Sequence, residues 1–469
     1  MIAPPNKNTR VENIWGEVSS NFPPLGLADL AGYIRKKGYN VKILDCTVES
    51  PSVQTFRQYF KKFFVDKYHS VMYIGFTAMT IHIKKAYKLA KICKEFYPDS
   101  ITIFGGVHST FVTDEVIKKS FVDIVVIGEG ELTLEEIING KPMNEIKGIA
   151  YKKYSNNRYE VIYNKPRDRI KNLDTMPMPA YDLLPISRYV PAKGSYKRLP
   201  AMSMVTSRGC PGKCTFCSKT LGNRLVFKSA EKIFDEIRYL METFGIKQIL
   251  FYDDTFTLNK KNVVELCKKI IKNNIDITWT CFARVDFISL EMLKYMKRAG
   301  CHQIMYGVET IDKQVLRNVN KNINLGQVIN ATKWTQEVGI ECRLAFMVGN
   351  PGDTYESIMR NSAFVNKLNP DYLIVNVTTP YPGTVMFEWA KERNLILTYN
   401  WDHYDFSKPI MKLETLDEKE IKKLYNLMYR KFYFRPSYFL KRLLKLRTIG
   451  DLKILVEGFT SLLSFIPKK

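Results

Sequence analysis

Short apolar runs alternate with amphipathic stretches along residues 40–127. The apolar runs lie at residues 41–44, 71–74, 101–104 and 124–127, and residues 84–97 between two of them follow a helical spacing. Strands that alternate with helices in this way are typical of βαβ units, which build a parallel sheet. The pattern therefore predicts an α/β fold in the first part of the chain.

Turn-forming residues follow each apolar run. They are Asp45, Gly75, Gly105-Gly106 and Gly128-Glu129-Gly130. Because open α/β sheets bind ligands beyond the carboxyl ends of their strands, these turns indicate where a cofactor would lie, although each glycine is equally compatible with a simple tight turn. No G-x-G-x-x-G motif follows an early strand, which disfavours a nicotinamide site.

A second alternating series begins near Met202. Its strands are expected around Met204 and at residues 249–252, 277–281, 303–306, 342–348 and 372–377. Six β/α repeats predict a barrel or a partial barrel, with the chemistry on the loops after the strands. Residues 148–163 show a hairpin pattern, and a proline-rich segment follows them. We therefore divide the chain into residues 1–145, a hairpin and linker at 146–195, a barrel at 196–400 and a basic helical region at 401–469.

Composition and charge narrow the functional class. The chain has 469 residues, of which 45% are hydrophobic, so it can bury large cores. The net charge of +24 suits a lysine-coated surface or an anionic partner, but no RNA-binding motif accompanies it, so nucleic acid is disfavoured. The longest uncharged runs are shorter than a spanning helix of about 18 residues, and no secretory pattern opens the chain, so we expect a cytoplasmic protein.

Three of the nine cysteines form the most specific motif. Cys210, Cys214 and Cys217 make a C-x₃-C-x₂-C pattern directly after the first strand of the second series. Three thiolates on one loop can hold three irons of a four-iron cubane and leave the fourth iron open for a ligand. A tetrahedral zinc site is the alternative, and Cys281 or Cys301 would then have to supply its fourth ligand.

The cysteine motif, with Phe216 before its last cysteine, resembles that of the radical S-adenosylmethionine (SAM) superfamily. Upstream, residues 23–28, 105–108 and 126–131 resemble the cobalamin-binding domain of its B12-dependent class, and further similarities lie at 253–256, 307–310, 348–352 and 380–384. The resemblance covers about residues 4–393. It implies an N-terminal Rossmann-like (flavodoxin-like) cobalamin-binding domain, a partial (β/α)₆ TIM-type radical SAM barrel and a C-terminal helical extension.

The resemblance also implies roles for particular residues. Cys210, Cys214 and Cys217 would ligate a [4Fe-4S] cluster whose open iron chelates SAM. Phe216 would pack by the adenine, and the polar SAM contacts would be Asp253, Asp254, Glu309 and Arg343. For Arg343, and for Arg284 after the third barrel strand, a structural ion pair is an equal alternative. The cobalamin contacts would be Thr77, Gly105, Gly106, His108, Gly128, Glu129 and Gly130.

Two departures from the family pattern concern cobalamin. Asp45-Cys46-Thr47-Val48 stands where a D-x-H-x-x-G motif would supply a histidine below the cobalt, so we expect a cobalt without a histidine ligand from this loop. We expect His108 to be a loop residue rather than that ligand. The chain also begins only three residues before Pro4. The first strand should therefore be nearly absent, which leaves cobalamin occupancy open.

The function implied by the resemblance is methyl transfer to an unactivated carbon, by way of a 5′-deoxyadenosyl radical and methylcobalamin. A non-methylating cyclisation, ring contraction or carbon-carbon bond formation is the first alternative, and a non-catalytic iron-sulfur or cobalamin sensor is the second. The expected partners are a small-molecule or lipid substrate and an electron donor of the flavodoxin or ferredoxin type. An apolar stripe at residues 452–466, next to basic residues, predicts either packing on the barrel or peripheral membrane contact.

Overall fold

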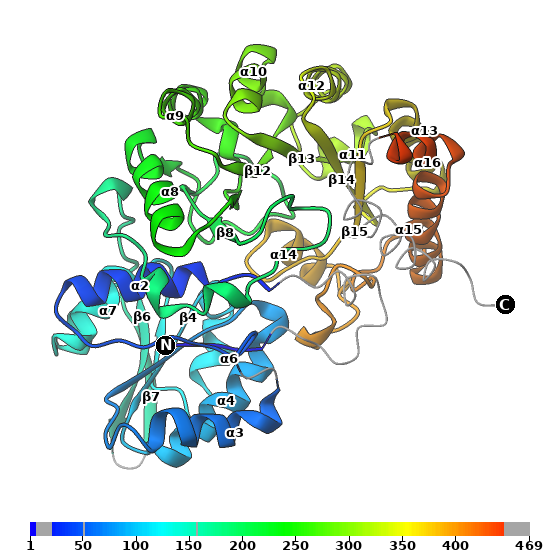
Figure 1. The fold of residues 1–469 in the computed structure, drawn as a ribbon. Helices are drawn as coiled ribbons and strands as arrows, with labels where there is room; N and C mark the ends of the chain where they lie inside the picture. The colour runs from blue at the N-terminus through cyan, green and yellow to red at the C-terminus, as the bar shows by residue number, and fades with distance from the viewer. Residues whose placement is uncertain (6–20, 50–51, 156–157, 445–469) are drawn as a thin grey trace.

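Two large β-sheets, each flanked by helices, organise the molecule (Figure 1). The computed structural model describes residues 1–5, 21–49, 52–155 and 158–444. The N-terminal sheet and its helices fill the lower left of Figure 1, and the second sheet lies above them. Within the described residues, no helix combines the length and apolar character needed to cross a bilayer. The predicted stripe at residues 452–466 lies outside the described residues.

The N-terminal sheet has seven strands in the order β2-β1-β3-β4-β5-β6-β7. Its strands are β1 (Ile2–Ala3), β2 (Leu44–Asp45), β3 (Tyr73–Thr77), β4 (Ile101–Gly105), β5 (Ile124–Val126), β6 (Ile149–Ser155) and β7 (Arg158–Tyr163). Its helices are α2 (Leu25–Lys36), α3 (Val53–Phe60), α4 (Ile83–Phe96), α5 (Val107–Phe111), α6 (Thr113–Ile117) and α7 (Glu131–Ile138). The pairs among β1 to β5 are parallel, as expected for a Rossmann-like fold. The short first strand is an inner strand of the sheet, because Ile2 pairs with both β2 and β3.

Two features of this sheet differ from the sequence-based expectation. Gly75 does not end a strand but pairs with Ile103 in the middle of β3. The strand predicted at residues 71–74 was placed too early, because β3 begins at Tyr73 and the apolar Met72 before it is 70% exposed. The hairpin β6-β7, which we assigned to the linker, pairs antiparallel with β5 and extends the N-terminal sheet. We therefore group the hairpin with the first sheet.

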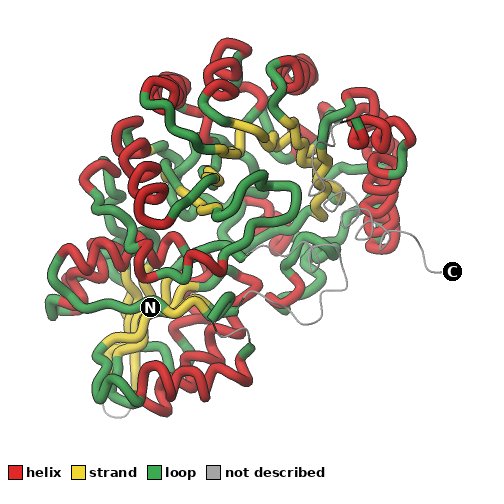
Figure 2. The backbone as a smooth tube through the Cα atoms, in the orientation of Figure 1, coloured by secondary structure: helices red, strands yellow, loops and turns green. Residues whose placement is uncertain are grey.

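The second sheet has six parallel strands in the order β15-β14-β13-β12-β11-β8, which confirms the predicted partial barrel. Its strands are β8 (Ala201–Met204), β11 (Gln248–Phe251), β12 (Thr278–Ala283), β13 (Cys301–Glu309), β14 (Glu341–Val348) and β15 (Tyr372–Val377). Its helices are α8 (Ala230–Phe244), α9 (Lys260–Lys272), α10 (Leu290–Arg298), α11 (Lys313–Asn318), α12 (Leu325–Glu337), α13 (Tyr355–Leu368) and α14 (Val385–Glu392). Helices α8, α9, α10 and α12 form an arc over the outer side of the strands (Figure 2).

The two faces of the barrel sheet differ in exposure. In β15 the side chains of Leu373, Val375 and Val377 are buried, whereas Tyr372 and Ile374, on the alternate face, are only half-buried. Successive residues of a strand point to opposite faces, so one face packs against the helices and the other retains accessible surface. The inner face of the partial barrel is therefore open to solvent or ligands.

The C-terminal helices α15 (Glu418–Tyr433) and α16 (Pro436–Leu443) cover the edge strand β15 (Figure 1). The hydroxyl of Tyr429 accepts from the amide of Val375 at 2.9 Å and donates to its carbonyl at 3.0 Å. Tyr433 makes the same pair of bonds with Leu373, at 3.0 and 2.7 Å. Two tyrosines one helical turn apart thus satisfy backbone groups of an edge strand, which would otherwise be open to pairing with another chain.

Candidate active site between the two sheets

The cysteine loop, residues 209–225, joins the antiparallel strands β9 (Ser207–Arg208) and β10 (Val226–Phe227). Gly209 opens the loop with a φ of +88°, and a Cβ atom there would lie 2.5 Å from the carbonyl oxygen of Arg224. Only glycine fits so close an approach. The amide of Cys210 donates to the carbonyl of Gly222 at 3.3 Å. These contacts bring the start and the end of the loop together.

The three motif cysteines are free thiols, with Cys210 and Cys214 half-buried and Cys217 exposed. In a cubane each thiolate binds a different iron, so the sulfurs stand apart, whereas the ligands of one zinc ion converge. Among the described residues, no three His, Cys, Asp or Glu side chains converge on a position for a single metal ion. Cys281 and Cys301 are buried in the barrel core. Three thiols on one loop match the ligand set of a four-iron cluster that leaves one iron open.

Asp253 follows β11 and holds the residues that lead into the cysteine loop. Its Oδ1 atom accepts hydrogen bonds from the Thr206 amide (2.9 Å), Thr206 Oγ1 (3.0 Å) and Ser207 Oγ (2.5 Å). Burial raises the pKa of this carboxyl to about 6, and no described residue pairs with its Oδ2 atom. Asp253 thus positions the loop with one oxygen and keeps a second, buried oxygen unpaired.

Asp254 and Arg284 place opposite charges beside the cysteine loop. Desolvation raises the pKa of the Cys217 thiol, and the negative charge of nearby Asp254 raises this pKa further. Arg284 Nη1 would lie 3.6 Å from a Cβ atom on Gly212 in the loop. Its Nε and Nη2 atoms donate to the Asp286 carboxylate at 3.0 and 2.8 Å. Arg284 therefore forms the structural ion pair we considered, and that pair lies against the loop.

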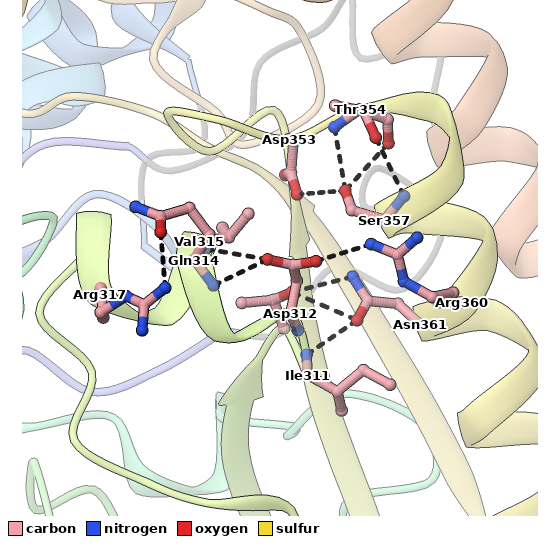
Figure 3. Close-up of polar contacts among 11 residues, drawn as sticks. Ile311, Asp312, Gln314, Val315, Arg317, Asp353, Thr354, Ser357, Arg360 and Asn361 are labelled. Atoms are coloured by element: carbon pink, nitrogen blue, oxygen red, sulfur yellow. Dashed lines mark hydrogen bonds and ion pairs between the residues drawn. The ribbon is translucent and has the colours of Figure 1, made fainter.

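Glu309 ends β13 with a φ of 67°, a backbone conformation that is rare outside glycine. Its Oε1 atom accepts from Lys321 Nζ at 3.1 Å, and both side chains are largely buried. The next turn is fixed to α13, since Asn361 Oδ1 accepts the amide of Ile311 at 2.8 Å (Figure 3). Left-handed backbone costs such a residue about 1–2 kcal/mol, so the surrounding contacts must maintain it. Strain of this kind is frequent at functional sites.

Phe216 lies in a small apolar cluster beside α14. It packs with Val319 and Met386, which are both buried. The neighbouring Thr215 fixes this arrangement, because its amide donates to the Val319 carbonyl at 3.0 Å and its carbonyl accepts from the Met386 amide at 2.9 Å. A role for Phe216 beside an adenine stays a prediction.

Arg343 lies away from the other predicted SAM contacts. It is near the amino end of β14, within the strand expected at residues 342–348, with five strand residues after it. Its Nη2 atom donates to the carbonyl of Gly194 at 2.8 Å, and its guanidinium lies 4.9 Å from the ring centroid of Tyr372. The alternation of the strand places it on the inner face. A role for Arg343 in binding SAM stays a prediction.

The carboxyl ends of β3, β4 and β5 bring the predicted cobalamin contacts together. Thr77 pairs with Gly105 in the sheet register, and a Cβ atom on Gly106 would lie 2.5 Å from Thr77 Oγ1. Thr110 Oγ1 donates to the Gly106 carbonyl at 2.9 Å and accepts from the Gly128 amide at 3.1 Å. Gly106 and Gly128 both have a positive φ. This edge is therefore a backbone surface that a ligand can approach closely.

We expected His108 to be a loop residue, but it lies in the short helix α5. Its side chain is buried, with Nδ1 3.3 Å from Thr80 Oγ1 and its ring edge-on to Trp401, 5.4 Å between centroids. Burial lowers its pKa to about 4, so it is neutral. Among the described residues its Nε2 atom has no partner.

Asp45 occupies the position where the family motif would begin, and its carboxylate is fully engaged. Oδ1 accepts from the amide of Thr47 at 2.9 Å, and Oδ2 accepts from the hydroxyl of Tyr189 in the linker at 2.8 Å. This loop therefore uses its acidic side chain to hold the linker.

An interdomain ion network joins the cysteine loop to the N-terminal sheet. Arg208, two residues before Cys210, pairs with Glu129 at 2.9 Å, with Glu131 at 2.6 Å and with Asp29 at 3.5 Å. Glu129 also accepts the amide of Ile170 at 2.8 Å. Gly130 lies between the two glutamates as the N-cap of α7. Sequence reasoning assigned no role to Arg208 or Asp29, and the only available signal was the position of Arg208 beside the cysteine motif.

Comparisons with known proteins give this geometry a family. The model of the radical SAM superfamily matches residues 204–365, and the model of the B12 binding domain matches residues 14–138. An uncharacterized methyltransferase of Pyrococcus horikoshii is 36% identical over 448 residues, which cover 94% of this chain and 93% of that protein. The chain belongs to the B12-binding class of the radical SAM superfamily.

Other relatives of this radical SAM protein differ in their named activities. An anaerobic magnesium-protoporphyrin IX monomethyl ester cyclase of Rubrivivax gelatinosus is 27% identical and aligns over 90% of this chain and 76% of its own. A hopanoid C-3 methylase of Methylococcus capsulatus is 25% identical over 85% of this chain and 74% of its own. The solved structure of OxsB with aqua-cobalamin and SAM shares the fold, with a TM-score of 0.73 at 19% identity over 99% of this chain and 71% of its own.

The cofactors of this class are a [4Fe-4S] cluster, SAM and cobalamin. The residues present fit them. Three thiols on one folded loop suit the cluster, and the unpaired buried Oδ2 of Asp253 lies close to that loop. Gly106 and Gly128 add no side chains to the edge of the N-terminal sheet, and a Cβ atom on Gly128 would meet no atom within 4 Å, which leaves space for a large planar ligand. The individual contacts to SAM and cobalamin stay predictions.

Proposed function

We propose that the protein is a cobalamin-dependent radical SAM methyltransferase that acts on an unactivated carbon of a small molecule. The observation that carries the proposal is the interdomain ion network, which holds the cysteine loop beside the glycine-rich edge of the N-terminal sheet. A methyl group can pass to a substrate radical only if both cofactors serve one cavity. Support for methylation itself comes from the 36% identical relative, which is named a methyltransferase.

The protein's own residues contribute positioning and exclusion of water. Cys210, Cys214 and Cys217 would hold the cluster, and Asp253 keeps their loop against the barrel. When bound, the cofactors supply the reductive cleavage of SAM and the methyl donor. The edge-to-face pair of Tyr252 and Phe282, with centroids 5.1 Å apart, presents an aromatic surface near the loop ends of β11 and β12. Such a surface limits access of water and of other quenchers to a reactive radical.

The inner face of the barrel supports a largely apolar substrate. Phe282, Met305 and Ile374 are half-buried on that face, and Phe282 and Met305 are neighbours in the sheet register. A lipid is our preferred substrate class, and the hopanoid methylase among the relatives agrees with it. Liposome flotation with and without residues 436–469 tests whether the chain reaches such a substrate at a membrane surface. Equal recovery of both forms would contradict membrane contact through this region.

Methyl-labelled SAM tests the proposal. Under anaerobic conditions with a reduced flavodoxin or ferredoxin as the electron donor, candidate apolar substrates should yield a product that carries the label. The cyclase among the relatives supports a second candidate, a non-methylating ring closure. Formation of 5′-deoxyadenosine and a modified product without label would establish that second function. Absence of 5′-deoxyadenosine under all conditions would favour a sensor and contradict both enzymatic proposals.

A further inference from the structure

We propose that Arg208 is a positioning residue that fixes the separation between the cluster site and the cobalamin site. Arg208 is on the short strand that leads into the cysteine loop, and all three of its acidic partners belong to the N-terminal sheet domain. The inference rests on the cobalamin-dependent function proposed above, but it does not depend on whether the substrate is methylated.

The network is buried. Side-chain exposure is 11% for Arg208, 6% for Glu129 and 4% for Glu131. Removing such charges from water costs several kcal/mol per ion, and apolar residues of similar volume are often no less stabilising. What a guanidinium adds is geometry, because its rigid fork bonds two carboxylates at defined angles. The arrangement is therefore better explained by orientation than by stability.

Two of the three partners are favoured in place without Arg208. Glu131 is in the first turn of α7, where the helix dipole favours a negative charge. Glu129 Oε2 accepts the Ile170 amide at 2.8 Å, so its other oxygen is directed at Arg208. The Glu129 carboxylate is therefore placed before the arginine engages it, and little side-chain entropy is lost in forming that pair.

The charges of the network depend on Arg208. Burial lowers the pKa of Arg208, but Glu131 and Asp29 more than offset this effect and raise it overall. Burial raises the pKa of Asp29 to about 6, although Lys228 and Arg208 oppose that shift. Three carboxylates around one guanidinium would repel one another without it. Loss of the Arg208 charge should therefore separate the two surfaces and not merely remove one contact.

The cysteine loop has a separate anchor on the barrel side. Asp253 binds Thr206 and Ser207, immediately before Arg208, through three hydrogen bonds. Arg169 also donates to the Arg208 carbonyl at 3.3 Å, a backbone contact that does not need the Arg208 side chain. The loop should therefore keep its fold when Arg208 is replaced. Its position relative to the N-terminal sheet should change.

Pulsed EPR of the holoenzyme tests this inference. The reduced cluster and cob(II)alamin each carry an unpaired electron, and their dipolar coupling falls with the cube of their separation. The wild-type protein should give one narrow distance distribution. R208Q should broaden it clearly, and R208K, which keeps the charge but lacks the fork, should give an intermediate width. E131Q removes one of the three ion pairs and should broaden the distribution less than R208Q does. The R208Q/E131Q pair should be no broader than R208Q alone, because R208Q already removes the pair with Glu131.

R198Q is the matched control. Arg198 makes a bidentate ion pair with Asp276 at 2.6 and 2.8 Å on the barrel, away from the N-terminal sheet. This variant should leave the distance distribution unchanged. Equal widths for wild type and R208Q would overturn the proposal. Loss of the cluster in R208Q would overturn it too, since Arg208 would then be needed for the loop to fold.

Hydrogen exchange keeps the inference testable if the wild-type protein takes up no cobalamin, an outcome that would contradict the proposed function. In cofactor-free protein, R208Q should speed exchange at residues 127–131 and 205–222, whereas R198Q should not. Unchanged exchange at both segments would contradict the positioning role. A protein that binds both cofactors but methylates nothing still gives the EPR distance, so the two proposals can fail separately.

Discussion

The two cofactor edges of the molecule are built by different means. At the carboxyl end of the barrel sheet, side chains with fixed partners dominate: Asp253 holds Thr206, and Glu309 pairs with Lys321. At the carboxyl end of the N-terminal sheet, the turns after β4 and β5 contain Gly106 and Gly128, and a Cβ atom on Gly128 would meet no atom within 4 Å. The first edge depends on chemical groups at given positions, and the second depends on the absence of side chains.

The largest effect is expected at the barrel edge. C210A removes one of the three proposed iron ligands, so anaerobic reconstitution should yield no stable [4Fe-4S] cluster, and 5′-deoxyadenosine formation should be abolished. Iron content and absorbance of the reconstituted protein measure this. C267A is the control, because Cys267 is buried in α9 and should affect stability alone, by about 1 kcal/mol. A full cluster in C210A would show that the motif does not ligate it.

The next effect is expected at the glycine edge. G106A introduces a Cβ atom 2.5 Å from Thr77 Oγ1 at a φ of +89°. The edge must then distort, so the affinity for cobalamin should fall about tenfold or more, which corresponds to about 1.4 kcal/mol. Cluster content should not change. Equilibrium dialysis against hydroxocobalamin measures the affinity.

G26A is the control for that change. A Cβ atom on Gly26 in α2 would meet no atom within 4 Å. Its cobalamin affinity should equal that of the wild type. If G106A also binds cobalamin normally, the glycine edge is not the cobalamin site, and the contrast between the two edges is lost.

The Glu309–Lys321 pair tests how much the side-chain contacts at the barrel edge contribute to stability. E309Q leaves the largely buried Lys321 without a charged partner, which should cost about 2–4 kcal/mol in unfolding free energy. In contrast, E242Q breaks the exposed Arg238–Glu242 pair and should cost less than about 0.5 kcal/mol. Urea unfolding of the two variants gives the comparison. Similar losses of unfolding free energy in both variants would mean that the buried Glu309–Lys321 pair contributes no more to stability than an exposed ion pair.

The last effect concerns the pH dependence of stability, at a buried carboxyl next to the barrel edge. Asp353 accepts a hydrogen bond from Ser357 (Figure 3), and burial raises its pKa from 3.8 to about 6. Between these values the folded protein binds the proton more tightly than the unfolded chain, so the stability due to this group falls as the pH rises from about 4 to 6 and is level above it. The stability of D353N relative to wild type should therefore increase over that range, by about 1–3 kcal/mol.

Asp312 provides the comparison for the pH experiment. Hydrogen bonds from Val315 and Gln314 and the Arg360 charge lower its pKa despite the opposing effect of burial. Asp312 therefore stays ionised in the folded protein between pH 5 and 7. The difference in stability between D312N and wild type should be constant over that range. Urea unfolding across pH measures both variants. A flat profile for D353N would contradict the raised pKa.

Sequence reasoning predicted what depends on periodicity and on local motifs. The six barrel strands follow the apolar runs, and the C-x₃-C-x₂-C spacing identifies the cysteine loop, because both signals lie within a few neighbouring residues. It failed where tertiary context decides. Met72 is apolar but exposed, so the start of β3 was misplaced.

Contacts between residues that are far apart in the sequence could not be predicted. The pairing of Arg208 with Glu131 joins residues 77 apart, and no spacing rule connects them. The hairpin β6-β7 was recognised as a hairpin, but its pairing with β5 depends on the whole sheet. The first of these omissions concerns how the two halves of the chain meet. That meeting is where the proposed chemistry takes place.

Anaerobic reconstitution followed by metal and corrinoid analysis tests the central claim most directly. The account predicts about four iron atoms per chain and a stoichiometric amount of cobalamin in the same protein, with an EPR signal of the reduced cluster that changes when SAM is added. A zinc-loaded protein, or a cluster whose signal is indifferent to SAM, would contradict it.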